Sequence, residues 1–221
     1  RSLNALAETW RSTADATGRF VPGFDPCSGG TASRVLVLMQ SPGPRTIAAG
    51  SAAVCSEDNL GPTAAAFRAA RIESGLSRDH YLRWNLIPWE IPGRVRPADI
   101  EEGRLALGEL LELLPALGAV VTYGTVALDG VMRYLTLHDD PRVVPVLAAP
   151  HPSPANGRHR ADQHLRIGMG GQAGRRRVER RADAAFHRHL GQGDQQPAIG
   201  HIMAGQHGAV LDAGADEIAI A

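Results

Sequence analysis

Residues 34–39 read Arg-Val-Leu-Val-Leu-Met, a short run with apolar side chains at five consecutive positions. A strand that is apolar on both faces is typical of a parallel sheet covered by helices on both sides, whereas a half-exposed strand alternates apolar and polar residues. Residues 119–123, Ala-Val-Val-Thr-Tyr, show a similar uninterrupted run. These two segments therefore predict buried strands of a parallel sheet.

Strands and helices alternate along the chain around these two segments. Further β-rich runs cover residues 81–87 and 143–149. Helical patterns cover residues 3–17, 62–74, 97–114 and 125–135, and Gly75 offers a left-handed cap after the second of them. The alternation predicts a βαβαβαβ unit, and hence an α/β fold with a mostly parallel sheet covered on both sides.

The pattern changes after Ile167. Residues 168–171, Gly-Met-Gly-Gly, interrupt a helical pattern that begins at residue 160, and the rest of the chain is rich in Gly, Gln, Arg and His with little periodicity. We therefore expect one domain over residues 1–167 and an irregular, poorly packed tail over residues 168–221. A frameshift in the gene would explain the abrupt loss of periodicity, and reading the other two frames of the DNA tests this hypothesis.

The composition predicts a folded protein and excludes several classes. Apolar residues make up 43% of the 221 residues, and 23 basic residues, all arginine, balance 23 acidic ones. Net charge therefore does not point to nucleic acid, although a neutral protein can carry a local basic patch. Cys27 and Cys55 are too few for a disulfide framework, a zinc site or an iron–sulfur cluster unaided. With no apolar run long enough for a membrane helix, we expect a cytoplasmic protein without metal, cofactor or membrane contact.

Polar and turn-forming residues follow each predicted strand. Residues 40–45, Gln-Ser-Pro-Gly-Pro-Arg, follow the first, and Asn85 lies near the end of the second. Gly124 and Thr125 follow the third, and residues 151–156, His-Pro-Ser-Pro-Ala-Asn, follow the fourth. Ligands of open parallel sheets bind outside the carboxyl ends of the strands, so the sequence predicts a binding site at this edge.

Four of these segments together resemble the uracil-DNA glycosylase superfamily. They are M-Q-S-P-G at residues 39–43, D-N-x-x-x-T at 58–63, W-N-L-I-P-W at 84–89 and H-P-S-P at 151–154, in a fitting order and spacing. The resemblance covers roughly residues 1–167. It implies a three-layer α/β/α sandwich with a four-stranded parallel sheet. It also implies hydrolysis of the bond between a deaminated base and its deoxyribose, after the nucleotide is rotated out of the DNA stack.

The resemblance assigns roles to two residues of this site. Asn85 matches the residue whose amide pairs with the uracil edge, and an amide offers the donor and the acceptor that such pairing requires. His151 matches the residue that hydrogen-bonds the base and stabilises the departing anion, for which a neutral imidazole is sufficient. Outside this context, Asn85 also fits a strand-end residue that satisfies backbone groups, and His151 fits a turn residue before proline.

The loop after the first strand departs from the family pattern. By resemblance Gln40, Ser41, Pro42 and Gly43 form the water-activating loop, yet some branches carry Asp at the place of Ser41 and others Glu at the place of Gln40. Gln40 can orient a water but cannot accept its proton, so we expect weak general-base catalysis. Asp58 is the nearest motif carboxylate and a reserve candidate, with a helix-capping role ahead of Pro62 as the alternative.

Further residues are expected to touch the base. Gly43 stands where the most uracil-specific branch carries Tyr, so it leaves space for broader specificity, serves the turn geometry, or does both. Phe67 lies on the helix whose family counterpart stacks a ring on the base, although core packing is the more conservative interpretation. Asn59 and Ser153 belong to the matching motifs and complete the expected substrate-binding set.

DNA is the expected partner, as single strand or as duplex containing a deaminated base. Residues 154–156, Pro154, Ala155 and Asn156, occupy the place of the loop that wedges into the minor groove, and Ala155 is a poor wedge. Single-stranded or mismatched sites should therefore be preferred. The phosphate contacts on either side of the flipped base are assigned to Arg45, Arg158 and Arg160. A solvated helix face is the alternative interpretation of Arg158 and Arg160.

The sequence therefore predicts a monomeric DNA repair glycosylase that acts on uracil or a related deaminated base. The missing carboxylate in the first loop favours a second hypothesis, a protein that binds damaged DNA without cleaving it. A weaker third hypothesis is a hydrolase of free nucleosides or nucleotides.

Overall fold

The computed structural model of the chain describes residues 2–15, 18–152, 169 and 172. In chain order the helices and strands are α1 (Leu3–Asp15), β1 (Val35–Met39), α2 (Pro44–Ala48), α3 (Pro62–Glu73), β2 (Tyr81–Asn85), α4 (Pro97–Glu112), β3 (Ala119–Tyr123), α5 (Thr125–Leu137) and β4 (Val146–Ala149). Short 3-10 turns lie at Gly30–Ala32, Gly50–Ala52 and Arg78–His80.

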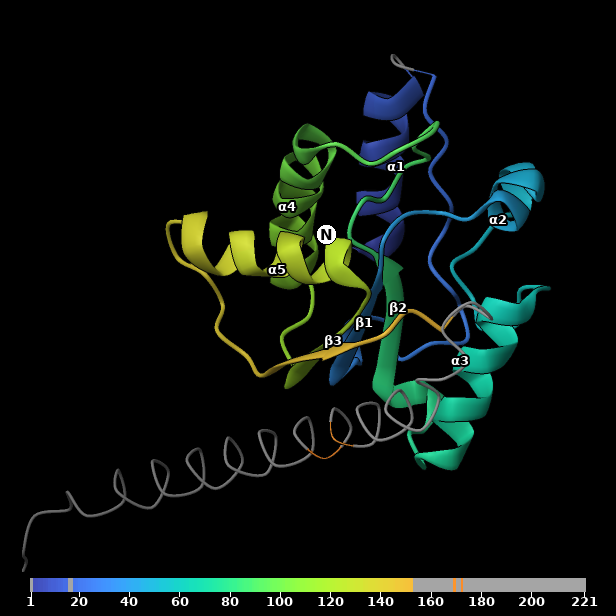
Figure 1. Cartoon of the computed structure of the whole chain (residues 1–221), viewed down its shortest axis with the longest axis vertical. Coiled ribbons are helices and arrows are strands. Elements are labelled where there is room, and N and C mark those ends of the chain that lie inside the picture. Colours follow the sequence, from blue (N-terminus) through green and yellow to red (C-terminus); the bar gives the residue numbers. More distant parts are fainter. Residues whose placement is uncertain (1, 16–17, 153–168, 170–171, 173–221) are drawn as a thin grey trace, which may run out of the picture. The chain divides into compact units, whose positions relative to one another are not determined.

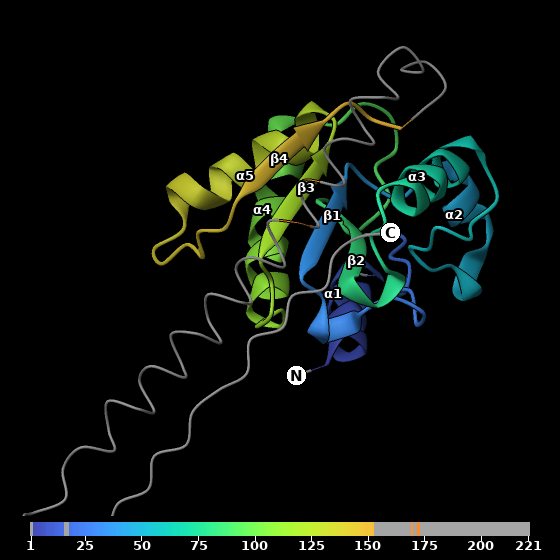
Figure 2. The same cartoon turned by 90° about the horizontal axis from the view of Figure 1, so that it is seen from below.

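The four strands form one parallel sheet in the order β2-β1-β3-β4 (Figure 1). Val35 of β1 lies opposite Tyr81 of β2 on one side and opposite Ala119 of β3 on the other. Figure 2 shows the strands side by side in this order. All residues of β1 and β3 are buried, as their uninterrupted apolar runs predicted.

Alternate residues of each strand face different layers. Leu36 and Leu38 of β1 belong to a large apolar cluster with residues of α1, α4 and α5. Val35, Val37 and Met39 of the same strand belong to a smaller cluster with residues of α3. Helices therefore cover both faces of the sheet, and the predicted α/β/α sandwich with a four-stranded parallel sheet is confirmed.

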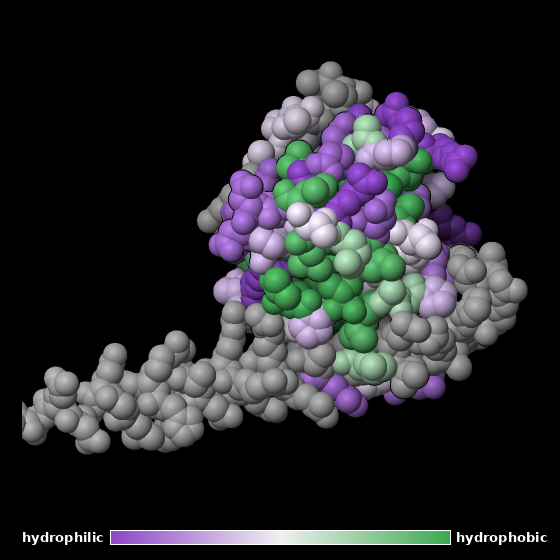
Figure 3. Space-filling model, turned by 60° about the vertical axis from the view of Figure 1, so that its left-hand side comes forward, coloured by the Kyte–Doolittle hydropathy of each residue, from purple (hydrophilic) through white to green (hydrophobic). Residues whose placement is uncertain are grey.

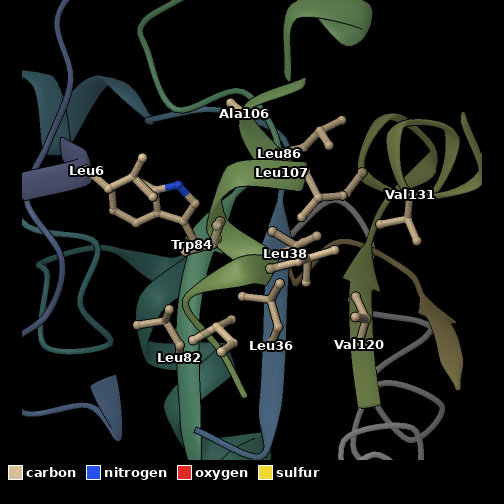
Figure 4. Packing of buried hydrophobic residues seen from close by; sticks show 14 of the residues in the cluster. Leu6, Leu36, Leu38, Leu82, Trp84, Leu86, Ala106, Leu107, Val120 and Val131 are labelled. Carbon is tan, nitrogen blue, oxygen red and sulfur yellow. The ribbon is translucent and has the colours of Figure 1, made fainter. Parts of the chain in front are cut away.

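Aromatic rings fill the large cluster beside α1. Trp84 of β2 stacks on Phe24 with ring centroids 3.8 Å apart, and its ring centroid lies 6.0 Å from that of Trp10. Figure 4 shows Trp84 extending between β2 and α1, next to Leu6. Large aromatic side chains contribute strongly to core stability, so Trp84 anchors α1 on the sheet.

The predicted element boundaries are close to the observed ones, with local exceptions. The fourth strand begins at Val146 rather than at residue 143, because Pro145 has no backbone N–H to donate to a neighbouring strand. The second strand ends at Asn85, although the N–H of Leu86 still donates to the carbonyl of Met39 at the end of β1, and the N–H of Ile87 donates to the carbonyl of Gln40. Helix α2 has only five residues, too few for a periodic pattern, and was not predicted.

Helix α5 carries apolar side chains that no described element covers. Met132 and Leu137 are both exposed. Figure 3, which brings the α5 side of the molecule forward, shows an apolar area bordered by hydrophilic residues. Within the described ranges, no helix is long and apolar enough to cross a membrane.

The segments predicted for the C-terminal part of the chain lie almost wholly outside the described residues. This applies to the helical pattern at 160–167 and, apart from residues 169 and 172, to the predicted irregular tail over 168–221. The domain boundary at residue 167 and the frameshift hypothesis remain predictions.

Candidate active site

A cavity of about 440 Å³ lies at the carboxyl edge of the sheet. This volume is in the usual range of sites for small ligands. Its walls come from the loop after β1, the segment before α3, the end of β2 and His151 after β4. The cavity brings together these predicted site residues: Ser41, Pro42, Gly43, Arg45, Asn59, Asn85 and His151.

Asn85 reaches the cavity as the last residue of β2. It is buried, with 7% of its surface exposed, and its Nδ2 donates a hydrogen bond to Cys55 Sγ at 3.2 Å. Burial raises the pKa of the Cys55 thiol to about 12, so this thiol stays neutral at physiological pH. Cys55 therefore helps to orient the Asn85 amide and is not an activated nucleophile.

His151 lies two residues after β4 and is half-buried. Its pKa lies below the usual value of 6.5, chiefly because burial disfavours the charged ring and further because Arg83 is positively charged. The imidazole is thus neutral near pH 7, with one ring nitrogen that donates and one that accepts hydrogen bonds. A neutral donor suits a hydrogen bond to a base that gains negative charge.

Gly43 has an ordinary extended conformation, with φ −81° and ψ 163°. A Cβ atom at this position would meet no atom within 4 Å. Since any residue can adopt these angles, the interpretation that Gly43 serves only the turn geometry is wrong. Because glycine has no side chain, space on the cavity wall stays open at this position.

Gln40 does not line this cavity. It is exposed and lines a wider adjoining groove of about 1080 Å³, which shares Ser41, Gly43 and His151 with the cavity. Glu90, which the sequence analysis did not single out, lines the same groove. The predicted water-positioning residue thus lies next to the cavity rather than inside it.

Asp58 lies away from the cavity wall, and both interpretations of it need correction. Its side chain is 53% exposed and forms ion pairs with Arg78 at 2.6 Å and Arg68 at 3.5 Å. The hydrogen bond from Arg78 holds the pKa of Asp58 below its usual value. The residue at the N-cap of α3 is Gly61, which makes no side-chain capping bond, so Asp58 neither caps the helix nor faces the cavity.

Phe67 is a core residue, and its predicted place against the base is wrong. It is fully buried on α3 and does not line the cavity. Its ring packs edge-on against Tyr81 and Tyr123, with centroid distances of 5.5 Å and 6.1 Å. The conservative interpretation, core packing, holds because α3 turns this side chain towards the sheet.

Two other predicted residues lie on the cavity wall near α2. Asn59 Nδ2 donates to the carbonyl oxygen of Val54 at 2.8 Å and to Thr46 Oγ1 at 3.4 Å, which ties the segment before α3 to α2. Arg45 is exposed, and its side chain lies over Gly61, where an added Cβ would be 3.2 Å from Arg45 Cδ.

The remaining predicted residues lie outside the described part of the chain. They are Ser153, Pro154, Ala155, Asn156, Arg158 and Arg160. Their expected contacts with base and phosphate remain predictions.

The sequence analysis missed Arg83, which lines the cavity together with Asn85 and His151. Its Nη1 donates to the carbonyl oxygen of Ser56 at 2.6 Å, and its Nη2 lies 3.7 Å from Met39 Sδ. Side chains two residues apart on a strand point to the same face, so the spacing from Asn85 could have identified Arg83. Cys55 and Leu60, also missed, carried no comparable signal.

A buried charged network holds the segment that carries Cys55 and Asn59. Glu57, only 1% exposed, accepts hydrogen bonds from Arg71 at 2.7 Å and 2.9 Å and from Tyr81 at 2.9 Å. Asp25 pairs with Arg78 at 2.9 Å and accepts a hydrogen bond from Ser56 at 2.8 Å. These contacts fix the cavity wall from behind.

The described residues contain no group of three or more His, Cys, Asp or Glu side chains that could hold a metal ion. The donor side chains on the cavity wall include amides, guanidinium groups, hydroxyl groups and the imidazole of His151. These groups can recognise and polarise a heterocyclic base by hydrogen bonds.

Comparison with known proteins agrees with this arrangement. A search of curated proteins finds no match. The family model described as Uracil DNA glycosylase superfamily matches residues 27–167, which include every wall of the cavity. This match covers more than half of the chain and supports a function of the DNA glycosylase type. The chain belongs to the uracil-DNA glycosylase superfamily.

Proposed function

We propose that the protein is a monomeric DNA repair glycosylase of the bacterial cytosol. It would hydrolyse the N-glycosidic bond of uracil or a related deaminated base in DNA. The observation that carries this proposal is the single cavity whose walls include both Asn85 and His151. An amide that reads a base edge and a neutral imidazole that stabilises a leaving base must act on one ligand, and here they line one space.

In this proposal the flipped nucleotide places its base in the cavity. The Asn85 amide, oriented by its bond to Cys55, pairs with the base edge. His151 donates a hydrogen bond to a base oxygen as negative charge develops there. The segment Ser41–Gly43 closes the wall beside the base. The open space at Gly43 would admit a substituent larger than the hydrogen atom at C5 of uracil.

The attacking water would come from the adjoining groove. Gln40 can orient this water by hydrogen bonds, and Glu90 is a carboxylate of the same groove that can take its proton. Since neither Gln40 nor Ser41 is a carboxylate, we expect slower base release than in family branches that carry one in this loop.

DNA would approach the cavity mouth beside α2 and the segment before α3. Arg45 is exposed there and can pair with a phosphate next to the flipped nucleotide. Leu60 is 84% exposed and also lines the cavity, so it can occupy apolar space left in the base stack.

The test is single-turnover base release from a uracil-containing oligonucleotide, single-stranded and then duplex, detected by alkaline strand cleavage. We expect release by the wild type and a loss of at least about 10²-fold in His151→Ala, the scale for removal of one transition-state donor. The mutant also controls for contaminating enzyme. An absence of release, with salt-sensitive DNA binding retained, would contradict the proposal and support a damage-binding protein.

A further inference from the structure

Arg83 is a partly buried cation on the cavity wall that forms no ion pair within the described structure. Neighbouring Arg71 and Arg78 form ion pairs with Glu57 and Asp25. Arg83, in contrast, contacts a backbone carbonyl and a thioether, and its Cζ lies over the Phe67 ring, 5.4 Å from the ring centroid. The nearby Glu57 carboxylate acts on its charge, but no carboxylate of the described residues lies within ion-pair distance of Arg83. The cavity lining within the described ranges also contains no carboxylate.

A charge withdrawn from water without a partner is costly. Removing a cation from water costs several kcal/mol, on the order of the total stability of a small domain, unless an opposite charge compensates it. Burial accordingly lowers the pKa of Arg83, yet an arginine of ordinary pKa above about 12 remains charged at neutral pH. The cavity therefore holds positive charge that an incoming anion can compensate.

The position of Arg83 matches the place where a base would bind. Arg83 and Asn85 point to the same face of β2, about 7 Å apart along the strand. The charge of Arg83 also lowers the pKa of His151, so it acts across the cavity on the second proposed base contact. Arg83, Asn85 and His151 thus all line one space.

We propose that Arg83 is a catalytic residue that stabilises the departing base as an anion. The inference rests on the proposed glycosylase function. The bond between the sugar C1′ and the base nitrogen breaks, and its electron pair stays on the base. A water adds to C1′ and gives up a proton, while the guanidinium compensates the negative charge delocalised over the base.

This role complements the missing carboxylate of the loop after β1. Heterolysis of the bond produces a positive sugar and a negative base, and stabilising either fragment lowers the barrier. Gln40 and Ser41 offer no charge to the sugar. Arg83 offers charge to the base, in a site where burial strengthens electrostatic interactions.

The first test measures binding of free bases and does not depend on catalysis. Barbiturate is a uracil-like ring that is anionic at neutral pH, whereas uracil is neutral. By titration calorimetry, wild type should bind barbiturate at least about tenfold more tightly than uracil, the scale of one buried charge contact. Arg83→Met, which keeps the length of the side chain, should lose this preference, and Arg83→Lys should retain part of it.

The matched control is Arg133→Met. Arg133 is partly exposed on α5, pairs with Asp129 at 3.1 Å and does not line the cavity. The Arg133→Met variant loses the same net charge as Arg83→Met, but away from the cavity. Its preference for barbiturate over uracil should therefore equal that of wild type. Circular dichroism checks the fold of each variant, and Arg83→Lys keeps the test valid if Arg83→Met is unfolded.

The second test uses the leaving group. In single-turnover release, Arg83→Met should slow uracil release by about 10²-fold. It should slow release of 5-fluorouracil less, because fluorine already stabilises the base anion. The rate of 5-fluorouracil release divided by the rate of uracil release should therefore rise in Arg83→Met and stay unchanged in Arg133→Met. A purely structural role would lower both rates equally.

Each outcome is decisive. An unchanged barbiturate preference or an unchanged rate ratio in Arg83→Met would overturn the role of Arg83 while the glycosylase function stands. If wild type binds barbiturate more tightly than uracil, Arg83→Met loses this preference, and wild type releases no base, the anion-binding site stands. In that case both the glycosylase function and the catalytic role are overturned.

Discussion

The two faces of the sheet use buried residues differently. The face under α1, α4 and α5 is an apolar cluster in which Trp84 stacks between other aromatic rings. The face under α3 has a smaller apolar cluster, bordered by Glu57 with its arginine partners and by the cavity. One face supplies hydrophobic stability, and the other holds buried charges in place beside the cavity.

The second face also contains a contrast of its own. The carboxylate of Glu57 is fully engaged by Arg71 and Tyr81, so it fixes a wall of the cavity. Arg83 contacts a carbonyl, a thioether and the Phe67 ring but forms no ion pair among the described residues, so we propose that its charge acts on a ligand. Pairing, rather than burial alone, separates positioning charges from charges that can act on a substrate.

The largest effect should come from the apolar face. Trp84→Ala removes a fully buried ring and should lower the free energy of unfolding by about 3–5 kcal/mol. Urea denaturation followed by circular dichroism measures this change. The control Met132→Ala alters an exposed side chain and should change the free energy by less than about 0.5 kcal/mol. Equal effects of the two variants would contradict the assignment of the core.

The charged network should show the next largest effect. Glu57→Gln leaves Arg71 and Arg78 without this carboxylate and should cost about 3 kcal/mol of unfolding free energy. The double variant Glu57→Gln with Arg71→Met should recover part of the loss, because it removes an uncompensated charge. Glu8→Gln, at a surface pair with Arg11, should cost less than about 1 kcal/mol. A denaturation series in which the double variant is the least stable would refute this account.

The pH dependence should report the link between Arg83 and His151. The folded-state pKa of His151 lies below its unfolded value near 6.5, so the unfolded chain takes up the proton first as pH falls. The contribution to stability is therefore constant above about pH 6.5 and is lost as pH falls towards the folded-state pKa. Base release should persist below pH 6.5 until His151 is protonated.

Arg83→Met should raise the pKa of His151, because it removes a nearby positive charge. The loss of activity at low pH should then begin at a higher pH. NMR titration of the imidazole, assigned with His151→Gln, measures the pKa in both proteins. An identical pKa in wild type and Arg83→Met would show that the two groups do not interact.

The smallest effect on stability should come from Gly43. Gly43→Ala should change the unfolding free energy by less than about 0.5 kcal/mol, because its backbone conformation is ordinary and its surroundings are open. Gly43→Tyr should fill that space and lower the release of 5-substituted uracils relative to uracil itself. Competition between the two substrates in one reaction measures the ratio. An unchanged ratio would mean that Gly43 does not border the base.

Much of the site could be predicted because several of its residues directly follow strands. Ser41, Asn85 and His151 lie at or just after strand ends, and a parallel sheet brings such positions to one edge. Asp58 and Phe67 could not be placed in this way. They lie in the loop and helix between β1 and β2, where the rotation of α3 and the arginines of other elements decide their contacts.

Local patterns in the sequence by themselves determined the buried strands, the helices between them and the edge of the sheet that forms the site. Apolar periodicity and proline or glycine boundaries act over a few residues, so they can be read without the fold. Only the tertiary structure decided which charges are paired. Arg78 meets Asp25 across 53 positions of the chain, while Arg83 meets no carboxylate in the described structure. Such pairing depends on contacts between distant segments, and these exist only after the sheet and its helices have packed.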